Sequence, residues 1–197
     1  MEITILMTKN RKISELARKH DIKIHLDGAR LWNASIATGI PISEYCSLFD
    51  SVSLCFSKGL GAPVGSVLVG SRPFITKAKH FRKLYGGGWR QAGLLAEACH
   101  YSLDHILPNL SNDHALAQEL ASGLQRLGFK IPYKTETNMV WVDLAHKGWT
   151  GETLANALEP HGIRIPASKD TLVRIVFHHQ ISKDAVETIL RVVENMI

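Results

Sequence analysis

The sequence is poor in cysteine and has neither long apolar runs nor the usual nucleotide-binding glycine patterns. Its 197 residues include three cysteines, Cys46, Cys55 and Cys99, and none forms a CxxC pair. This usage is typical of reduced thiols rather than of a disulfide framework. No stretch approaches the roughly 18 consecutive apolar residues of a membrane helix, and the N-terminus lacks the pattern of a secretory signal. We therefore expect a cytoplasmic protein without a membrane partner.

The composition is that of a globular chain, and its positive charge is unevenly distributed. Hydrophobic residues make up 45% and charged residues 21%, which excludes disorder, collagen and coiled coil. The net charge of +5 divides into +7 for residues 1–100 and −2 for the remainder. Such a basic region can bind nucleic acid, bind a small phosphate or carboxylate compound, or simply face solvent. Six basic residues follow one another with no acid among them: Arg72, Lys77, Lys79, Arg82, Lys83 and Arg90.

Hydrophobic periodicity predicts an α/β region followed by a smaller α+β region. Strands are expected at 22–26, 51–56 and 66–70, with helices at 10–20, 30–38 and 73–84 and a long helix at 89–106. Pro108 and Asn109 then interrupt the helices. Beyond them, helices are expected at 109–127, 150–161 and 182–196, and strands at 138–143, 163–165 and 172–177. We therefore divide the chain into domains 1–108 and 109–197.

Two chemically distinctive residues follow predicted strands. Lys58 comes just after the strand at 51–56 and is followed by the glycine-rich stretch Gly59–Gly65, whereas Asp27 ends the first strand. Such a lysine can bind phosphate or form a covalent bond to a carbonyl carbon, although the Walker A and GxGxxG patterns are absent. Taken alone, the lysine is more typical of an exposed loop and the aspartate of a turn. Together, at the carboxyl ends of neighbouring parallel strands, an amine and a carboxylate suit pyridoxal phosphate.

Five segments carry a resemblance to a known enzyme family. They are HLDGARLWNA (25–34), SVSLCFSKGLGAPVGSVLVGS (51–71), RKLYGGGWRQAG (82–93), TNMVWVD (137–143) and LVRIVFHH (172–179). They closely resemble the low-specificity L-threonine aldolases, within the aromatic amino acid β-eliminating lyase/threonine aldolase group. The resemblance implies a fold-type I pyridoxal phosphate enzyme. This chain would hold part of the three-layer α/β/α large domain and a small α+β C-terminal domain.

The resemblance also assigns roles to seven residues. Lys58 would bond to the cofactor aldehyde and Asp27 would contact the pyridine nitrogen, which makes both catalytic. Arg174 would bind the substrate carboxylate, because a guanidinium can donate two parallel hydrogen bonds. The other expected cofactor contacts are Arg30, which is also placed near the substrate, together with Ser57, Lys83 and Arg90.

The activity implied is cleavage of L-threonine or L-allo-threonine to glycine and acetaldehyde, in a homodimer or homotetramer. Members of the family carry an N-terminal region before the aspartate loop, and the first residues here do not resemble it. We therefore expect this chain to bind the cofactor weakly and to turn over slowly or not at all. The alternatives are another fold-type I enzyme, such as an aminotransferase or carbon–sulfur lyase, and a non-catalytic truncated paralogue or fragment. Nucleic-acid binding ranks below these.

The remaining candidate residues have plainer interpretations. His178 and His179 are adjacent on a predicted strand and point to opposite faces, so no metal site is expected there. His25 is interpreted as a packing histidine on the same side as Asp27. The four tryptophans are expected in the core or at interfaces rather than stacked on a ligand; they are Trp32, Trp89, Trp141 and Trp149.

Overall fold

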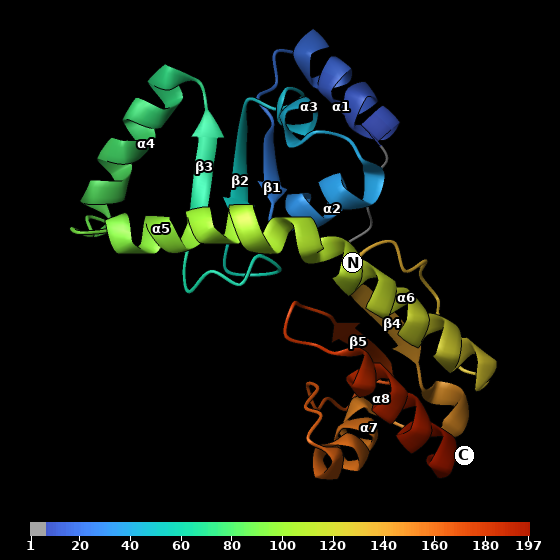
Figure 1. The fold of residues 1–197 in the computed structure, drawn as a ribbon. Coiled ribbons are helices and arrows are strands. Elements are labelled where there is room, and N and C mark those ends of the chain that lie inside the picture. The colour runs from blue at the N-terminus through green and yellow to red at the C-terminus, as the bar shows by residue number, and fades with distance from the viewer. Residues whose placement is uncertain (1–6) are drawn as a thin grey trace. The chain divides into compact units, whose positions relative to one another are not determined.

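The computed structural model describes residues 7–197. The chain forms two compact units, divided between Pro108 and Asn109 (Figure 1). Each unit has its own sheet: three strands in the first and two in the second, among the residues described. No helix in this part of the chain has the length and apolar character needed to cross a bilayer.

The sheet of the first unit combines a parallel and an antiparallel pair. β1 (His25–Gly28) lies parallel to β2 (Ser51–Cys55), and β3 (Ser66–Gly70) lies antiparallel to β2. The parallel pair is joined by a crossover that contains α2 (Leu31–Thr38) and α3 (Ile42–Cys46). The ten residues between β2 and β3 contain no helix, and they reverse the chain instead.

The core of the first unit lies on one face of β1 and β2. Val52 and Leu54 of β2 pack with Leu31 of α2 and Tyr45 of α3, and all four are buried. α1 (Met7–Lys19) is fixed to this core by Ser14, whose hydroxyl donates to the Leu48 carbonyl at 2.6 Å. Strand alternation leaves the polar side chains of β1 and β2 on the opposite face.

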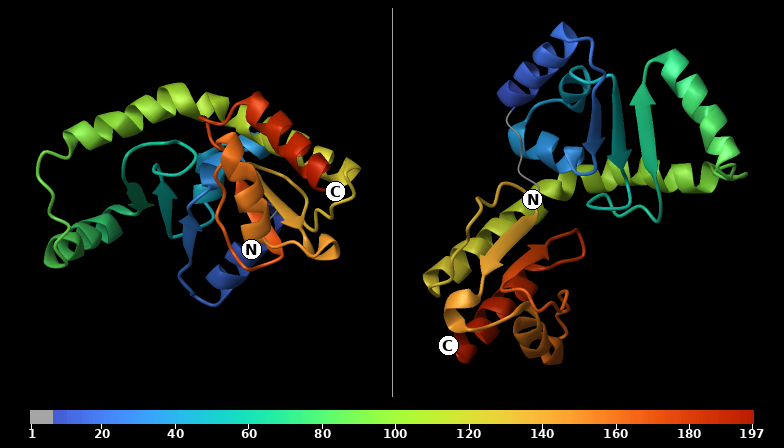
Figure 2. Two further views of the ribbon diagram at one scale, coloured as in Figure 1. Left: turned by 90° about the horizontal axis from the view of Figure 1, so that it is seen from below. Right: turned by 180° about the vertical axis from the view of Figure 1, so that it is seen from behind.

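The elements of the first unit that follow β2 bury fewer of their residues than β1, β2 and the helices packed on them. All five residues of β3 are exposed, and neither α4 (Arg72–Leu84) nor α5 (Gly93–Tyr101) contains a buried residue. Figure 2 shows α5 on one side of the sheet and α1 on the other, which is the expected α/β/α layering. The helix predicted at 89–106 is shorter in the structure: α5 begins at Gly93, and a π turn (Ser102–Ile106) replaces the last predicted turn. A 3-10 turn (Leu107–Asn109) follows it.

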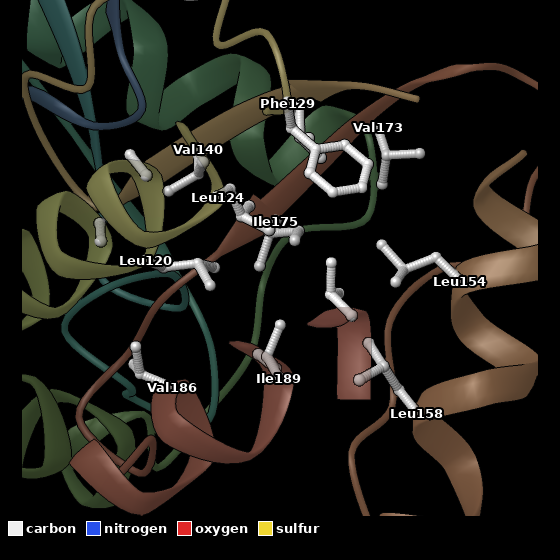
Figure 3. Packing of buried hydrophobic residues seen from close by; sticks show 14 of the residues in the cluster. Leu120, Leu124, Phe129, Val140, Leu154, Leu158, Val173, Ile175, Val186 and Ile189 are labelled. Atoms are coloured by element: carbon white, nitrogen blue, oxygen red, sulfur yellow. The ribbon is translucent and has the colours of Figure 1, made fainter. Parts of the chain in front are cut away.

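The second unit is an antiparallel pair of strands covered by three helices. β4 (Met139–Asp143) pairs with β5 (Leu172–Val176), and the helices are α6 (Leu110–Arg126), α7 (Gly151–Leu158) and α8 (Lys183–Met196). One sheet face supplies Val140, Val142, Val173 and Ile175 to the core. The helices cover that face with further apolar residues (Figure 3), which include Leu120, Leu124, Leu154, Leu158, Val186 and Ile189.

Two predicted strands differ from those observed. The first begins at His25 rather than at residue 22, because the Ile24 N–H donates to the Asp50 carboxylate (3.0 Å) instead of joining a ladder. The strand expected at 163–165 does not form. Ile163 and Ile165 instead pack, partly buried, against the core of the second unit.

Candidate active site

The carboxyl ends of β1 and β2 bring Asp27 and Lys58 to the same edge of the sheet. Asp27 is the penultimate residue of β1 and lies opposite Ser53 of β2, whereas Lys58 follows the last residue of β2 by three positions. Both side chains are exposed. Parallel strands end at a common edge, so an amine and a carboxylate face solvent from adjacent segments there.

A tight turn fixes Asp27 where β1 ends. Its Oδ1 accepts a hydrogen bond from the Ala29 N–H at 3.1 Å, as in an Asx turn. Gly28 allows the strands to approach closely, since a Cβ at this position would lie 2.6 Å from the Ser53 carbonyl oxygen. Arg30 is half-buried and is the residue directly before the first turn of α2. The Asp-Gly-Ala-Arg sequence therefore holds a carboxylate and a guanidinium three residues apart in one loop.

The loop that carries Lys58 is closed by its own backbone. The Phe56 N–H donates to the Gly65 carbonyl, the Ala62 N–H to the Phe56 carbonyl, and the Gly61 N–H to the Lys58 carbonyl, all at 2.9–3.0 Å. Gly61 has a φ of 66°, a conformation that glycine adopts without strain. Phe56 and Ala62 are buried beneath the loop. The apolar residues thus anchor the loop and leave the Lys58 amine exposed.

Two further polar residues lie near Asp27 and Lys58 in the sequence. Ser57 belongs to the sheet edge, and His25 belongs to the polar face of the sheet. Ser57, next to Lys58, is exposed. His25 shares its strand face with Asp27, and its Nδ1 lies 2.8 Å from the Ser51 hydroxyl. The interpretation of His25 as a packing residue is wrong, because its side chain is exposed. Its position on the same side as Asp27 agrees with the prediction, because the two residues are two positions apart on one strand.

Two of the predicted cofactor contacts lie farther along the first unit. Lys83 is in the last turn of α4 and Arg90 is in the segment that precedes α5; both are exposed. In Figures 1 and 2, α4 lies on the far side of β3 from β2. The structure therefore places Asp27, Arg30, Ser57 and Lys58 in the segments where β1 and β2 end, at one sheet edge, and Lys83 and Arg90 in and after α4.

Arg174 belongs to the second unit, in the middle of β5. Its strand neighbours Val173 and Ile175 are buried in the core, and Arg174 is exposed on the other face, as strand alternation predicts. Its guanidinium carbon lies 5.7 Å from the centre of the Trp141 ring on β4. Trp141 is half-buried and is not part of the hydrophobic core cluster.

The second unit also buries a carboxyl group that sequence reasoning missed. Asp113, in the first turn of α6, is only 3% exposed. Burial raises the pKa of Asp113 to about 6, and the charge of His179 opposes this rise. A polar residue in a first helical turn gives no sequence signal of burial.

In residues 7–197, no group of three or more histidine, cysteine or acidic side chains is arranged to hold a metal ion.

Comparison with solved structures defines the class of fold. The chain aligns over 98% of its length with 57% of a Listeria monocytogenes protein, at a TM-score of 0.81 and 24% identity. The alignment with the Leishmania major threonine aldolase covers 96% of this chain and 56% of that protein, at a TM-score of 0.74 and 17% identity. The chain therefore shares the mixed α/β fold of these proteins and covers more than half of each of them.

Sequence comparison identifies the family. Residues 4–147 match the family model described as beta-eliminating lyase, and the chain belongs to this family. It is 44% identical over 192 residues to a low-specificity L-threonine aldolase of Candida albicans, covering 95% of this chain and 49% of that protein. It is 47% identical over 174 residues to low-specificity L-threonine aldolase 1 of Arabidopsis thaliana, covering 87% and 49%. The chain spans about half the length of these relatives.

Proposed function

We propose that this chain carries the cofactor lysine, the ring-nitrogen carboxylate and the carboxylate-binding arginine of a threonine aldolase. The reaction is cleavage of L-threonine or L-allo-threonine to glycine and acetaldehyde. The observation that carries the proposal is the parallel pairing of β1 and β2, from which Asp27 and Lys58 reach one sheet edge. The 44–47% identity to proteins named low-specificity L-threonine aldolases supports this choice of reaction.

The side chains of this edge have the chemistry that pyridoxal phosphate requires. A primary amine can bond to the aldehyde carbon, a carboxylate can pair with the ring nitrogen, and a hydroxyl can donate to the phosphate. Lys58, Asp27 and Ser57 supply these groups, with Arg30 in the same loop as Asp27. Lys83 and Arg90 add positive charge for the phosphate, in this subunit or in the neighbour of a homodimer or homotetramer.

Each residue has a defined task in the proposed reaction. Bound pyridoxal phosphate supplies an electron-accepting ring. Asp27 would hold the ring nitrogen, because a carboxylate there would favour the protonated nitrogen that accepts electrons. Arg174 binds the substrate carboxylate through its parallel N–H groups, which sets the orientation of the bonds at the α carbon. Lys58 holds the cofactor between turnovers.

Reductive trapping tests the assignment of Lys58. The chain is incubated with pyridoxal phosphate, reduced with borohydride, digested and mapped by mass spectrometry. We expect the label on Lys58, its loss in Lys58→Ala, and its retention in Lys79→Ala, which removes an exposed lysine of α4. A label confined to another lysine would contradict the proposal.

Product analysis then tests the reaction. Glycine and acetaldehyde in equal amounts from L-threonine support aldol cleavage, whereas a keto acid or sulfide from other amino acids indicates an aminotransferase or a carbon–sulfur lyase.

Three free thiols, Cys46, Cys55 and Cys99, accord with the cytoplasm as the proposed location.

A further inference from the structure

The face of the β4–β5 sheet that is turned away from the core carries one aromatic–cation pair. The register of the strands places Trp141 directly opposite Arg174. The residues that flank Trp141 on β4, Val140 and Val142, point into the core and are completely buried. Trp141 is therefore not needed to fill the core, and its large side chain lies on the face that also presents Arg174.

The contact between these two side chains has the geometry of a cation–π interaction. The guanidinium carbon of Arg174 lies 5.7 Å from the centre of the Trp141 ring. A cation within about 6 Å of a tryptophan ring is attracted to the electron-rich face. The indole also limits the positions that the long and otherwise exposed arginine side chain can occupy.

A second aromatic residue fixes the indole in turn. Tyr133 contacts Trp141 with ring centres 5.9 Å apart and ring planes at 77°, an edge-to-face arrangement. Edge-to-face pairs are favourable because the positive edge of one ring meets the negative face of the other. Tyr133, Trp141 and Arg174 thus form a row of successive contacts from the segment before β4 to the middle of β5.

We propose that Trp141, held by Tyr133, is a positioning residue that orients Arg174 for a substrate carboxylate. When the guanidinium stacks on the ring, the ring covers its flat face. The N–H donors lie in the plane of the guanidinium and stay available for a carboxylate, which binds edge-on through two parallel hydrogen bonds. This inference rests on the proposed function, in which Arg174 binds the α-carboxylate.

Nuclear magnetic resonance of the full chain tests the pairing without any need for turnover. The Nε–Hε signal of Arg174, identified by its absence in Arg174→Lys, is expected at an upfield position because it lies near the indole. Trp141→Leu should remove this shift, and Trp141→Phe should keep part of it because phenylalanine retains an aromatic face. An Arg174 signal that does not respond to Trp141→Leu would overturn the inference and leave the proposed function standing.

Titration with glycine, the proposed product, tests the consequence for binding in the presence of pyridoxal phosphate. Glycine should shift the Arg174 signal, and glycinamide, which lacks the carboxylate, should not. Trp141→Leu should weaken glycine binding about two- to fivefold, as expected for loss of a partly exposed cation–π contact, and Trp141→Phe should restore most of it. Unchanged glycine affinity in Trp141→Leu would refute the positioning role. If glycine does not shift Arg174 in the parent chain, the assigned role of Arg174 fails, and the positioning role fails with it.

Discussion

Replacement of Asp113 by asparagine should stabilise the second unit above neutral pH and have little effect in acid. Asp113 is 3% exposed, and its Oδ2 has no hydrogen-bond partner within the described residues. Burial raises the pKa of Asp113 from 3.8 to about 6 in the folded chain. The folded state therefore binds this proton more tightly than the unfolded state. The resulting stabilisation is complete below about pH 4 and is lost as the pH rises through about 6.

The size of the effect follows from this difference in pKa. Two pKa units correspond to about 3 kcal/mol at 1.36 kcal/mol per unit. Relaxation of the fold and water penetration around the ionised carboxylate reduce this to about 1–2 kcal/mol. The helix N-terminus opposes this gain, because it stabilises an ionised aspartate by roughly 0.3–1 kcal/mol and asparagine loses that stabilisation. Asp113→Asn should therefore raise the free energy of unfolding at pH 8 by about 1 kcal/mol.

Urea unfolding followed by circular dichroism at pH 4.5, 6 and 8 measures this difference. Asp184→Asn is the matched control, because Asp184 is an exposed carboxylate in the first turn of α8. It should lower the stability slightly at pH 8 and show no gain. If Asp113→Asn were no more stable than the control at pH 8, or if its gain were as large at pH 4.5, burial would not be the cause.

Three further outcomes are expected. Gly123→Ala in α6 should destabilise the second unit by about 1–2 kcal/mol in urea unfolding, since a Cβ there would lie 2.5 Å from Leu190 Cδ1; Leu190→Ala should relieve this clash in the double variant. Asn138→Ala should cost about 1–2 kcal/mol, because the buried amide Nδ2 donates to the Phe177 carbonyl at 2.7 Å; an unchanged urea midpoint would refute this. Lys58→Ala should reduce glycine release from threonine to background in a chromatographic assay, whereas equal release by parent and variant would exclude Lys58 from the reaction.

Much of the framework was predictable because it depends on neighbours in the sequence. The alternation around residues 172–177 predicted that Val173 and Ile175 would be buried and that Arg174 would face the other way, as the structure shows. The helical crossover between the first two strands predicted their parallel pairing, which β1 and β2 confirm. Asp27 and Lys58 could be placed at one sheet edge from this pairing alone, since the carboxyl ends of parallel strands lie together.

Other features could not be derived from local pattern. The start of β1 at His25 depends on Asp50, which lies 26 residues from Ile24 and takes its N–H. The direction of β3 was not assigned, although the absence of a helix between residues 56 and 65 is a signal for an antiparallel return. The segment at 163–165 is apolar enough for a strand, but the two-stranded sheet of the second unit pairs only β4 with β5.

By itself, the sequence determined the order of the elements, the buried sides of the strands and the residues that end β1 and follow β2. Periodicity and chain connectivity act over a few residues, or through one crossover, and they can be read along the chain. Only the tertiary structure decided that Trp141 lies against Arg174, 33 positions away, and that Asp113 is buried. Those contacts depend on strand register and helix packing, which place residues together that no local pattern connects.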